Sequence, residues 1–320
     1  MSGRESYVSI RKTSSTKYPI GIGIPQGSII GPVLFLIYIN DLPNVSNILF
    51  PTLFADDTNF SISHQNYSEM IPVLNNELTK VHDWTLSNRL TINFDKTELL
   101  LFTNRDVPID VASVQLNGNN LEFRNHARFL GVIVDDKMNF KEHISHVLGK
   151  ISKHAGILFR IKNNLPTSAR ISYYNAFVLP YLSYNCIHWG GSNESHLLPL
   201  VLMQKRLVRT IADAGFRDHT TPLFYRLKML KLHDLYKFHA VVDTHIKILN
   251  GSYRTSHSVN TRNKLSVPKF HRLSRTQQSI TFKGPTLWNE IPDVLKNQNC
   301  VSRFKRELKS FYLNQYSSNS

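Results

Sequence analysis

The sequence predicts an α+β fold in which a β-rich first part is followed by an all-helical second part. Two observations predict it. Short alternating runs and hairpin turns fill the first part, whereas apolar residues recur at helical spacing in the second. The charge changes at the same place: residues 1–136 carry 10 Lys+Arg and 14 Asp+Glu, and residues 137–320 carry 28 and 9. We therefore expect two domains, residues 1–138 and residues 139–320.

The first part is expected to begin with strands and a buried helix. Residues 6–10 alternate like a strand, and IGIGIPQGS reads as a strand that runs into a Pro/Gly turn. Ser28 can cap the next helix. Residues 31–41 are apolar on every face, and such a helix is normally buried.

Hairpins and one amphipathic helix are expected to follow. Residues 48–63 read as two short strands with Asp56 and Asp57 at the turn between them. Residues 68–88 have apolar residues on one helical face. The other β elements are expected as a strand–turn–strand at 89–102, a hairpin at Asn117-Gly118 and a closing strand at 127–135.

The second part is expected to be helical and basic. Helical periodicity predicts helices at about 140–162, 167–189, 194–212, 222–249 and 301–315, with an irregular stretch at 252–285. The excess of 19 positive charges over residues 137–320 favours a polyanion-binding region, and nucleic acid is the partner that it indicates. The alternative is a solvated basic surface that serves solubility.

Composition excludes several classes of protein. With 41% hydrophobic residues, the 320-residue chain is globular rather than disordered. The longest apolar run, residues 29–39, is too short to span a bilayer, and the N-terminus lacks the apolar core of a signal peptide. We therefore expect a soluble, intracellular protein with no membrane partner. Two distant cysteines and scattered histidines argue against a disulfide framework or a structural zinc site.

Two adjacent carboxylates stand inside the apolar run TLFADDTNF. Burying an unpaired carboxylate is costly and two neighbours repel each other, so Asp56 and Asp57 require compensation. A hairpin turn presents both at one tip, and carboxylate oxygens suit Mg²⁺. Asp pairs are also common in ordinary turns, so the three letters ADD carry little weight without their context.

That context resembles a known family. GIPQGSIIGPVLFLIYINDLP followed by LFADD, and then WTLSNRLTINFDKTELLLF and FLGVIVDDKMNFKEHI, resemble in order and spacing the reverse transcriptases of non-LTR (LINE-type) retrotransposons. The resemblance implies a partial reverse-transcriptase palm over residues 1–138, an antiparallel sheet with packed helices. Residues 139–320 would then be a basic helical thumb and C-terminal helical region.

The resemblance also implies roles for individual residues. Asp56 and Asp57 match the catalytic pair that binds Mg²⁺ (or Mn²⁺), with Asp56 the more essential ligand, and Lys96 matches a lysine that protonates pyrophosphate or contacts phosphate. The residues that match the nucleotide and template contacts are Gln26, Gly27 and Ala55, and those that match the primer grip are Phe129, Leu130 and Gly131. The implied partners are an RNA template, a DNA primer and deoxynucleoside triphosphates, and the implied compartment is the nucleus.

Several of these residues have a simpler interpretation. Lys96 could be an ordinary turn lysine, and Phe129 and Leu130 could be plain core residues. Asp135-Asp136 is expected to be a solvated turn between palm and thumb. A run of aromatic residues at helical spacing is expected to pack in the core, with base stacking as the alternative; these residues are Tyr173, Tyr174, Phe177, Tyr181 and Tyr184.

The match also lacks parts of the family pattern. A palm needs a further carboxylate well upstream of the PQG loop, but the only acidic residue before Pro25 is Glu5, and the fingers are absent. We therefore expect a C-terminal portion of a retrotransposon polyprotein that starts inside the palm. We expect such a chain to be inactive by itself as an RNA-directed DNA polymerase. The alternatives are a non-catalytic RNA- or DNA-binding module and a decayed retrotransposon remnant.

Overall fold

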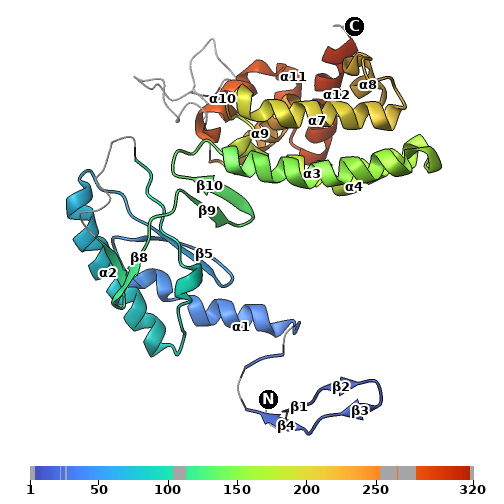
Figure 1. The fold of residues 1–320 in the computed structure, drawn as a ribbon. Helices are drawn as coiled ribbons and strands as arrows, with labels where there is room; N and C mark the ends of the chain where they lie inside the picture. The colour runs from blue at the N-terminus through green and yellow to red at the C-terminus, as the bar shows by residue number, and fades with distance from the viewer. Residues whose placement is uncertain are drawn as a thin grey trace. The chain divides into compact units, whose positions relative to one another are not determined.

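The structure is a computed structural model that describes residues 4–21, 23–25, 27–103, 113–252, 265 and 279–317 (Figure 1). The chain divides into two compact units. Unit 1 comprises residues 1–99 and 104–123, and unit 2 comprises residues 100–103 and 124–320. Each unit is described by itself below.

Unit 1 begins with two small antiparallel strand pairs. The strand expected at residues 6–10 is divided between them. The strand expected at residues 20–24, before the PQG turn, is not found in the described residues: the nearby β4 ends at Ile20. The pairs are β1 (Arg4–Ser6) with β4 (Tyr18–Ile20) and β2 (Ser9–Ile10) with β3 (Thr13–Ser14). Glu5 in β1 forms an ion pair with Lys17, in which Nζ and Oε2 are 3.3 Å apart.

Helix α1 (Ile30–Ile39) forms as expected, but the prediction that it is buried is wrong. The Ser28 hydroxyl accepts a hydrogen bond from the Gly31 N–H and so satisfies a free donor of the first turn. Only Ile39 is buried, and Ile37 is 68% exposed. The apolar pattern predicts which faces a helix can bury. Burial itself requires other elements to pack against those faces, and the described residues of unit 1 cover only a small part of the surface of α1.

The middle of unit 1 follows the prediction closely. Strands β5 (Phe50–Phe54) and β6 (Asp57–Ser61) form a hairpin, and α2 (Tyr67–Ser87) is capped by the Asn66 side chain. Strands β7 (Val114–Leu116) and β8 (Asn119–Leu121) turn at Asn117 and Gly118, both with positive φ. The Asn75 side chain on α2 accepts a hydrogen bond from the Gln115 N–H and ties this hairpin to the helix.

The strand–turn–strand expected at 89–102 is wrong. The segment is extended, with a 3₁₀ turn at Phe94–Lys96 and a single isolated bridge between Leu99 and Phe123. The described strands of the whole chain form separate two-stranded pairs rather than the continuous antiparallel sheet of the expected palm. Alternating sequence specifies an extended segment, but a ladder also needs a neighbouring strand with free backbone groups.

Unit 2 opens with a hairpin that the sequence had assigned to the first domain. Strands β9 (His126–Phe129) and β10 (Val132–Asp135) are paired, and Val132 joins the core of unit 2. The His143 ring on α3 (Lys141–Ile161) accepts a hydrogen bond from the Ile133 N–H. The compact units therefore divide near Phe123, ahead of residue 138, because β10 packs on α3.

Asp135 is not the solvated turn residue that the sequence predicted. It is 7% exposed, and its carboxylate accepts hydrogen bonds from the N–H groups of Lys137, Asn139 and Phe140 at 3.1, 3.0 and 2.6 Å. These bonds shape the turn that leads into α3. Asp135 thus has a structural role that neither its spacing nor its neighbour Asp136 indicated.

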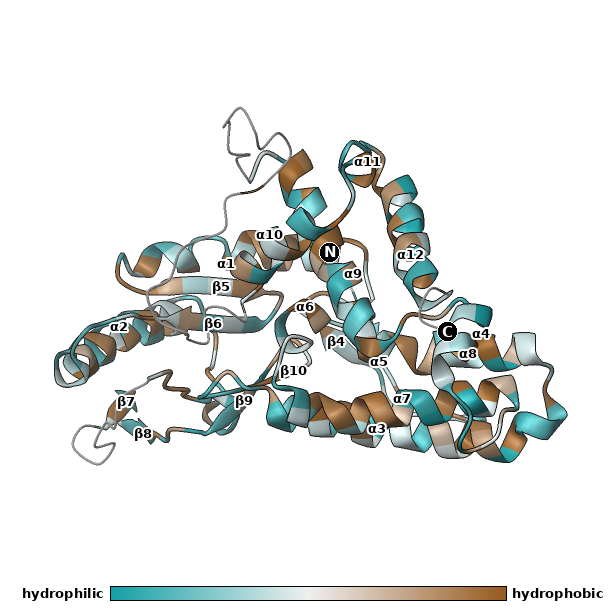
Figure 2. Cartoon of the chain, turned by 90° about the horizontal axis from the view of Figure 1, so that it is seen from above, coloured by the Kyte–Doolittle hydropathy of each residue, from teal (hydrophilic) through white to brown (hydrophobic). Residues whose placement is uncertain are grey.

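The rest of unit 2 is helical, as expected, with one correction: α10 (Ile280–Glu290) begins inside the stretch 252–285 that was expected to be irregular. Residues 253–264 and 266–278 of that stretch lie outside the described residues. Two predicted helices are broken. The one at 167–189 is interrupted after Phe177 and again at Asn185, and the one at 222–249 is interrupted at Lys228; Asn185 and Lys228 have positive φ. α3 lies beside α7 (Figure 1) and alternates hydrophobic and hydrophilic residues along its length (Figure 2). The helices after α3 are α4 (Thr167–Phe177), α5 (Leu179–Ser183), α6 (Cys186–Trp189), α7 (Glu194–Ala212), α8 (Thr220–Arg226), α9 (Leu232–Leu249), α10 (Ile280–Glu290), α11 (Asp293–Lys296) and α12 (Val301–Ser317).

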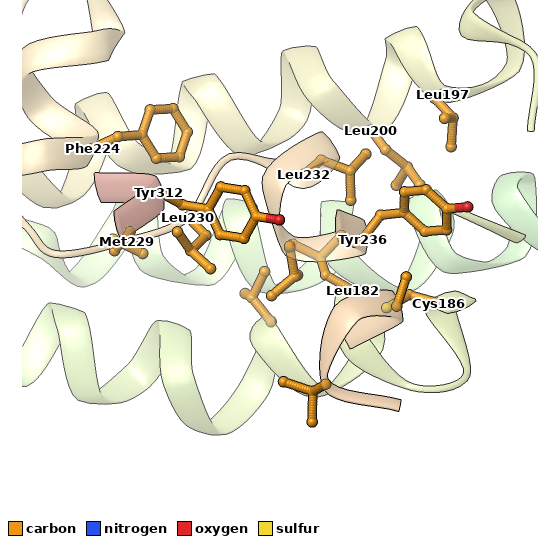
Figure 3. Packing of buried hydrophobic residues seen from close by; sticks show 14 of the residues in the cluster. Leu182, Cys186, Leu197, Leu200, Phe224, Met229, Leu230, Leu232, Tyr236 and Tyr312 are labelled. Carbon is orange, nitrogen blue, oxygen red and sulfur yellow. The ribbon is translucent and has the colours of Figure 1, made fainter. Parts of the chain in front are cut away.

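One large hydrophobic core holds these helices together. Side chains from α7, α8, α9 and α12 meet in it, as Figure 3 shows for Leu200, Phe224 and Tyr312. Gln204 is the polar centre: its side chain donates to the Tyr174 hydroxyl and to a backbone carbonyl, and accepts from a backbone N–H. None of the helices in the described residues is both long and apolar enough to cross a membrane.

Candidate functional site

Asp56 and Asp57 lie at the tip of the β5–β6 hairpin. Phe54 pairs with Asp57, so Ala55 and Asp56 form a two-residue turn between the strands. Ala55 has φ +51°, a left-handed conformation that a two-residue hairpin turn requires and that costs a non-glycine residue about 1–2 kcal/mol. The small side chain keeps the tip open next to the carboxylates.

The two carboxylates are exposed rather than buried among the apolar residues around them. Water therefore solvates both charges, and the desolvation that the sequence suggested does not arise. Their oxygen atoms are the ligand type that Mg²⁺ prefers. Within the described residues, no three His, Cys, Asp or Glu side chains are grouped so that they could hold a metal ion. The pair therefore offers two ligands and fits part of a magnesium site.

The PQG turn and α1 form a shallow hollow of about 600 Å³ in unit 1. Gly23, Gly27, Gly31 and Phe35 are among the residues that line it. Gly27 has φ +84°, and a Cβ there would meet no atom within 4 Å, so the backbone conformation rather than crowding favours glycine. Gln26 lies outside the described residues.

Lys96 ends the 3₁₀ turn at Phe94–Lys96. The Asn93 side chain accepts a hydrogen bond from the Lys96 N–H at 3.2 Å and so fixes the backbone of the turn. The Lys96 side chain is exposed. The turn holds the lysine at a defined backbone position and leaves its ammonium group accessible.

Phe129, Leu130 and Gly131 form the turn end of the β9–β10 hairpin in unit 2. Leu130 and Gly131 are the two turn residues, with φ +45° and +83°, and Phe129 pairs with Val132. All three are half-buried, which is intermediate between a plain core residue and an exposed one. The Tyr184 hydroxyl donates a hydrogen bond to the Leu130 carbonyl at 2.5 Å, and its ring lies against Gly131.

The predicted site residues thus belong to two compact units. The hairpin tip, Gly27 and Lys96 are in unit 1, and the β9–β10 turn is in unit 2. Sequence reasoning assigned Tyr184 to a run of core aromatic residues and missed its contact with the β9–β10 turn, because that turn lies 54 positions earlier in the chain. Only the structure reveals such a distant contact.

Comparison with known proteins agrees with the sequence pattern. Residues 4–134 match the family of reverse transcriptases (RNA-dependent DNA polymerases). The RNA-directed DNA polymerase from mobile element jockey of Drosophila melanogaster is 26% identical over 259 residues, which cover 77% of this chain and 28% of the relative. The probable RNA-directed DNA polymerase from transposon X-element of the same species is 25% identical over 243 residues, which cover 73% of this chain and 26% of the relative.

A third relative extends the similarity over most of the chain. The probable RNA-directed DNA polymerase from transposon BS of Drosophila melanogaster is 25% identical over 292 residues, 88% of this chain and 32% of the relative. The chain therefore spans about a third or less of the length of these relatives. No solved structure matches the chain.

Proposed function

We propose that this chain, a relative of the reverse transcriptases of non-LTR retrotransposons, takes part in RNA-directed DNA synthesis. The single observation that supports the proposal most is the Asp56-Asp57 pair at the open tip of the β5–β6 hairpin. The pair occurs within the segment that matches the reverse transcriptase family. The reaction would join a deoxynucleotide to a primer 3′-hydroxyl on an RNA template, and the nucleus is the compartment we propose for it.

In this proposal Asp56 and Asp57 hold Mg²⁺ (or Mn²⁺). A bound pair of ions would activate the primer hydroxyl and neutralise charge on the transferred phosphate. Gly27 leaves the side of the PQG turn open to a base pair, and Lys96 contacts a phosphate or protonates the leaving pyrophosphate. The turn at Phe129–Gly131 holds the primer end, and its half-buried residues keep that turn in one shape.

We further propose that the 320-residue chain does not synthesise DNA by itself. Two carboxylates are fewer ligands than a stable site for two hard cations needs, and the described residues supply no third beside them. Metal geometry controls the reaction closely, so a partial ligand set would reduce the rate by orders of magnitude.

Primer extension tests both statements. The chain would be compared with a chimera in which it replaces the matching segment of the jockey polymerase, on an RNA template with a DNA primer and Mg²⁺. We expect extension by the chimera only. Asp56→Asn or Asp57→Asn in the chimera should reduce it on the order of 100-fold or more, since each removes a charge-stabilising group. Asp83→Asn, which changes an exposed acid on α2, is the matched control.

Two results would contradict the proposal. Full activity of the Asp56→Asn chimera would show that the hairpin tip holds no essential metal. Robust extension by the unfused chain, abolished by Asp56→Asn, would show that the two carboxylates suffice and that the inactivity we propose is wrong.

A second candidate function is nucleic-acid binding without catalysis. The observation in its favour is the excess of 19 positive charges over residues 137–320. Binding of the full chain to RNA or DNA should then weaken steeply as salt rises, because each phosphate contact releases condensed counterions. Affinity that does not change between 50 and 200 mM salt would exclude this function.

A further inference from the structure

Four aromatic rings of unit 2 form a contiguous patch, which we call the aromatic patch: His154, Tyr173, Phe177 and Tyr181. They come from three successive helices, α3, α4 and α5. The His154 ring is stacked on Phe177, with centroids 5.5 Å apart and planes 20° apart, and it lies 6.0 Å from Tyr181. The Tyr173 ring is 4.8 Å from Phe177, and its hydroxyl is hydrogen-bonded to His154 Nδ1 at 3.1 Å.

The aromatic patch lies at the surface and is not an extension of the core. Phe177 is 47% exposed and Tyr181 is 36% exposed, whereas Tyr174, next to Tyr173 in the chain, is 2% exposed and bonded to Gln204. Helix α4 therefore directs one ring into the core and its neighbours to the surface. The expectation that this run of aromatic residues packs in the core is correct for Tyr174 and in part for Tyr173, which is half-buried and packs against the core. It is wrong for Phe177, Tyr181 and Tyr184.

The chain around the aromatic patch is strongly basic. Residues 137–193 contain seven Lys or Arg residues and a single acidic one, Glu142. Arg170 is buried and donates to backbone carbonyls, and Lys162 is paired with Asp213, so these two do not contribute to the surface charge near the aromatic patch. Lys150 lies one helical turn before His154 on the same face of α3, and Lys153 is adjacent to His154. Both lysines are exposed, and neither forms an ion pair within the residues that the structure describes. The surroundings thus favour a negatively charged partner.

We propose that the aromatic patch is a base-stacking platform for single-stranded nucleic acid. The exposed faces of Phe177 and Tyr181 stack on unpaired bases, and Lys150 and Lys153 neutralise neighbouring phosphates. A duplex does not fit this description, because its bases already stack on each other and present only edges in the grooves. The inference rests on the proposed function only in that nucleic acid is the substrate, and it does not require catalysis.

An apolar protein partner would use the same rings differently. It would need their hydrophobic area but not their π faces, and it would gain nothing from the excess of lysine. Replacing Phe177 or Tyr181 by leucine keeps an apolar side chain against α3 and removes the π face. This substitution therefore separates stacking from hydrophobic contact without emptying the space that the ring fills.

The test measures binding of the full chain to labelled 12-mers by fluorescence anisotropy. The strands are oligo(U), oligo(dT) and an abasic strand with the same number of phosphates. Phe177→Leu and Tyr181→Leu should each weaken binding to both base-bearing strands about tenfold, as expected for one lost stack. Binding to the abasic strand should change less than about twofold, because it has no bases to stack.

Two controls accompany the test. Phe216→Leu changes another ring of unit 2, 86% exposed and outside the aromatic patch, and should leave all three affinities within about twofold. Lys150→Gln and Lys153→Gln should each reduce the slope of log affinity against log salt by about one. Circular dichroism of each variant confirms that its helices are intact.

Equal losses on base-bearing and abasic strands, or no loss on the base-bearing strands, would overturn the proposal. These results are independent of DNA synthesis, because no deoxynucleoside triphosphate is present. An active chimera whose Phe177→Leu variant binds oligo(U) normally would leave the proposed function intact and refute the platform alone. A chimera that does not extend the primer, but whose Phe177→Leu variant loses affinity for the base-bearing strands alone, would refute the proposed function and support the base-stacking platform.

Discussion

Asp135→Ala should destabilise unit 2 by about 3 kcal/mol. The substitution removes a carboxylate that accepts three backbone hydrogen bonds at 3.1, 3.0 and 2.6 Å and is 7% exposed. A hydrogen bond to a charged group contributes roughly 1.5–3 kcal/mol, and loss of a helix cap costs about 0.5–2 kcal/mol. The three bonds share one carboxylate and water can replace some of them, so the total lies well below three times the single value.

Urea unfolding of the full chain measures this effect. Trp189, fully buried in unit 2, reports the transition by fluorescence, and circular dichroism at 222 nm follows the helices. Asp136→Ala is the matched control, since it removes the adjacent carboxylate, which accepts none of the three bonds, and should cost about 0.5 kcal/mol or less. If Asp135→Ala costs less than about 1 kcal/mol, or if the two variants are equally destabilised, the buried turn does not have the role assigned to it.

Two further predictions concern unit 2. Burial, with the nearby charges of His146 and Arg128, lowers the pKa of His143 to about 4. The unfolded chain binds that proton near pH 6.5, so stability present above pH 6.5 should decrease by about 3 kcal/mol as pH falls to 4. Urea midpoints should show this decrease. Burial also lowers the pKa values of His188, His239 and His245, so His143→Gln should make the total decrease about 3 kcal/mol smaller rather than abolish it; an equal decrease in the variant would exclude His143 as a source. Lys228 has φ +54° just after α8, a position where glycine is favoured, so Lys228→Gly should raise stability by about 0.5–1 kcal/mol and Lys228→Ala should not. A lower urea midpoint for Lys228→Gly would contradict this reasoning.

Local elements were predictable where the sequence contains its own signal. The Asn117-Gly118 turn, the one-faced helix α2 and the hairpin that carries Asp56 and Asp57 at its tip all follow from short patterns, and the structure confirms them, although Asp57 is the first residue of β6 rather than a turn residue. In each case residues that are near in the chain determine the outcome. Turn chemistry and helical periodicity are local properties, so a single sequence is enough.

Tertiary partners were not predictable in the same way. Helix α1 is apolar on every face yet mostly exposed, because burial depends on which elements pack against it. Asp135 and Asp136 are identical in type and adjacent, but only Asp135 turns toward the N–H groups ahead of α3. Tyr184 reaches a turn in a distant part of the chain. Each of these depends on three-dimensional packing, which no short pattern records.

Mapping the metal on the full chain tests the central claim most directly. Fe²⁺ in place of Mg²⁺, with ascorbate and peroxide, generates hydroxyl radicals that cut the backbone beside the ligands. The account predicts cleavage within residues 54–58 that excess Mg²⁺ suppresses and that Asp56→Asn and Asp57→Asn abolish. Cleavage confined to other segments, or cleavage at 54–58 that persists in both variants, would contradict a metal site at the tip of the β5–β6 hairpin.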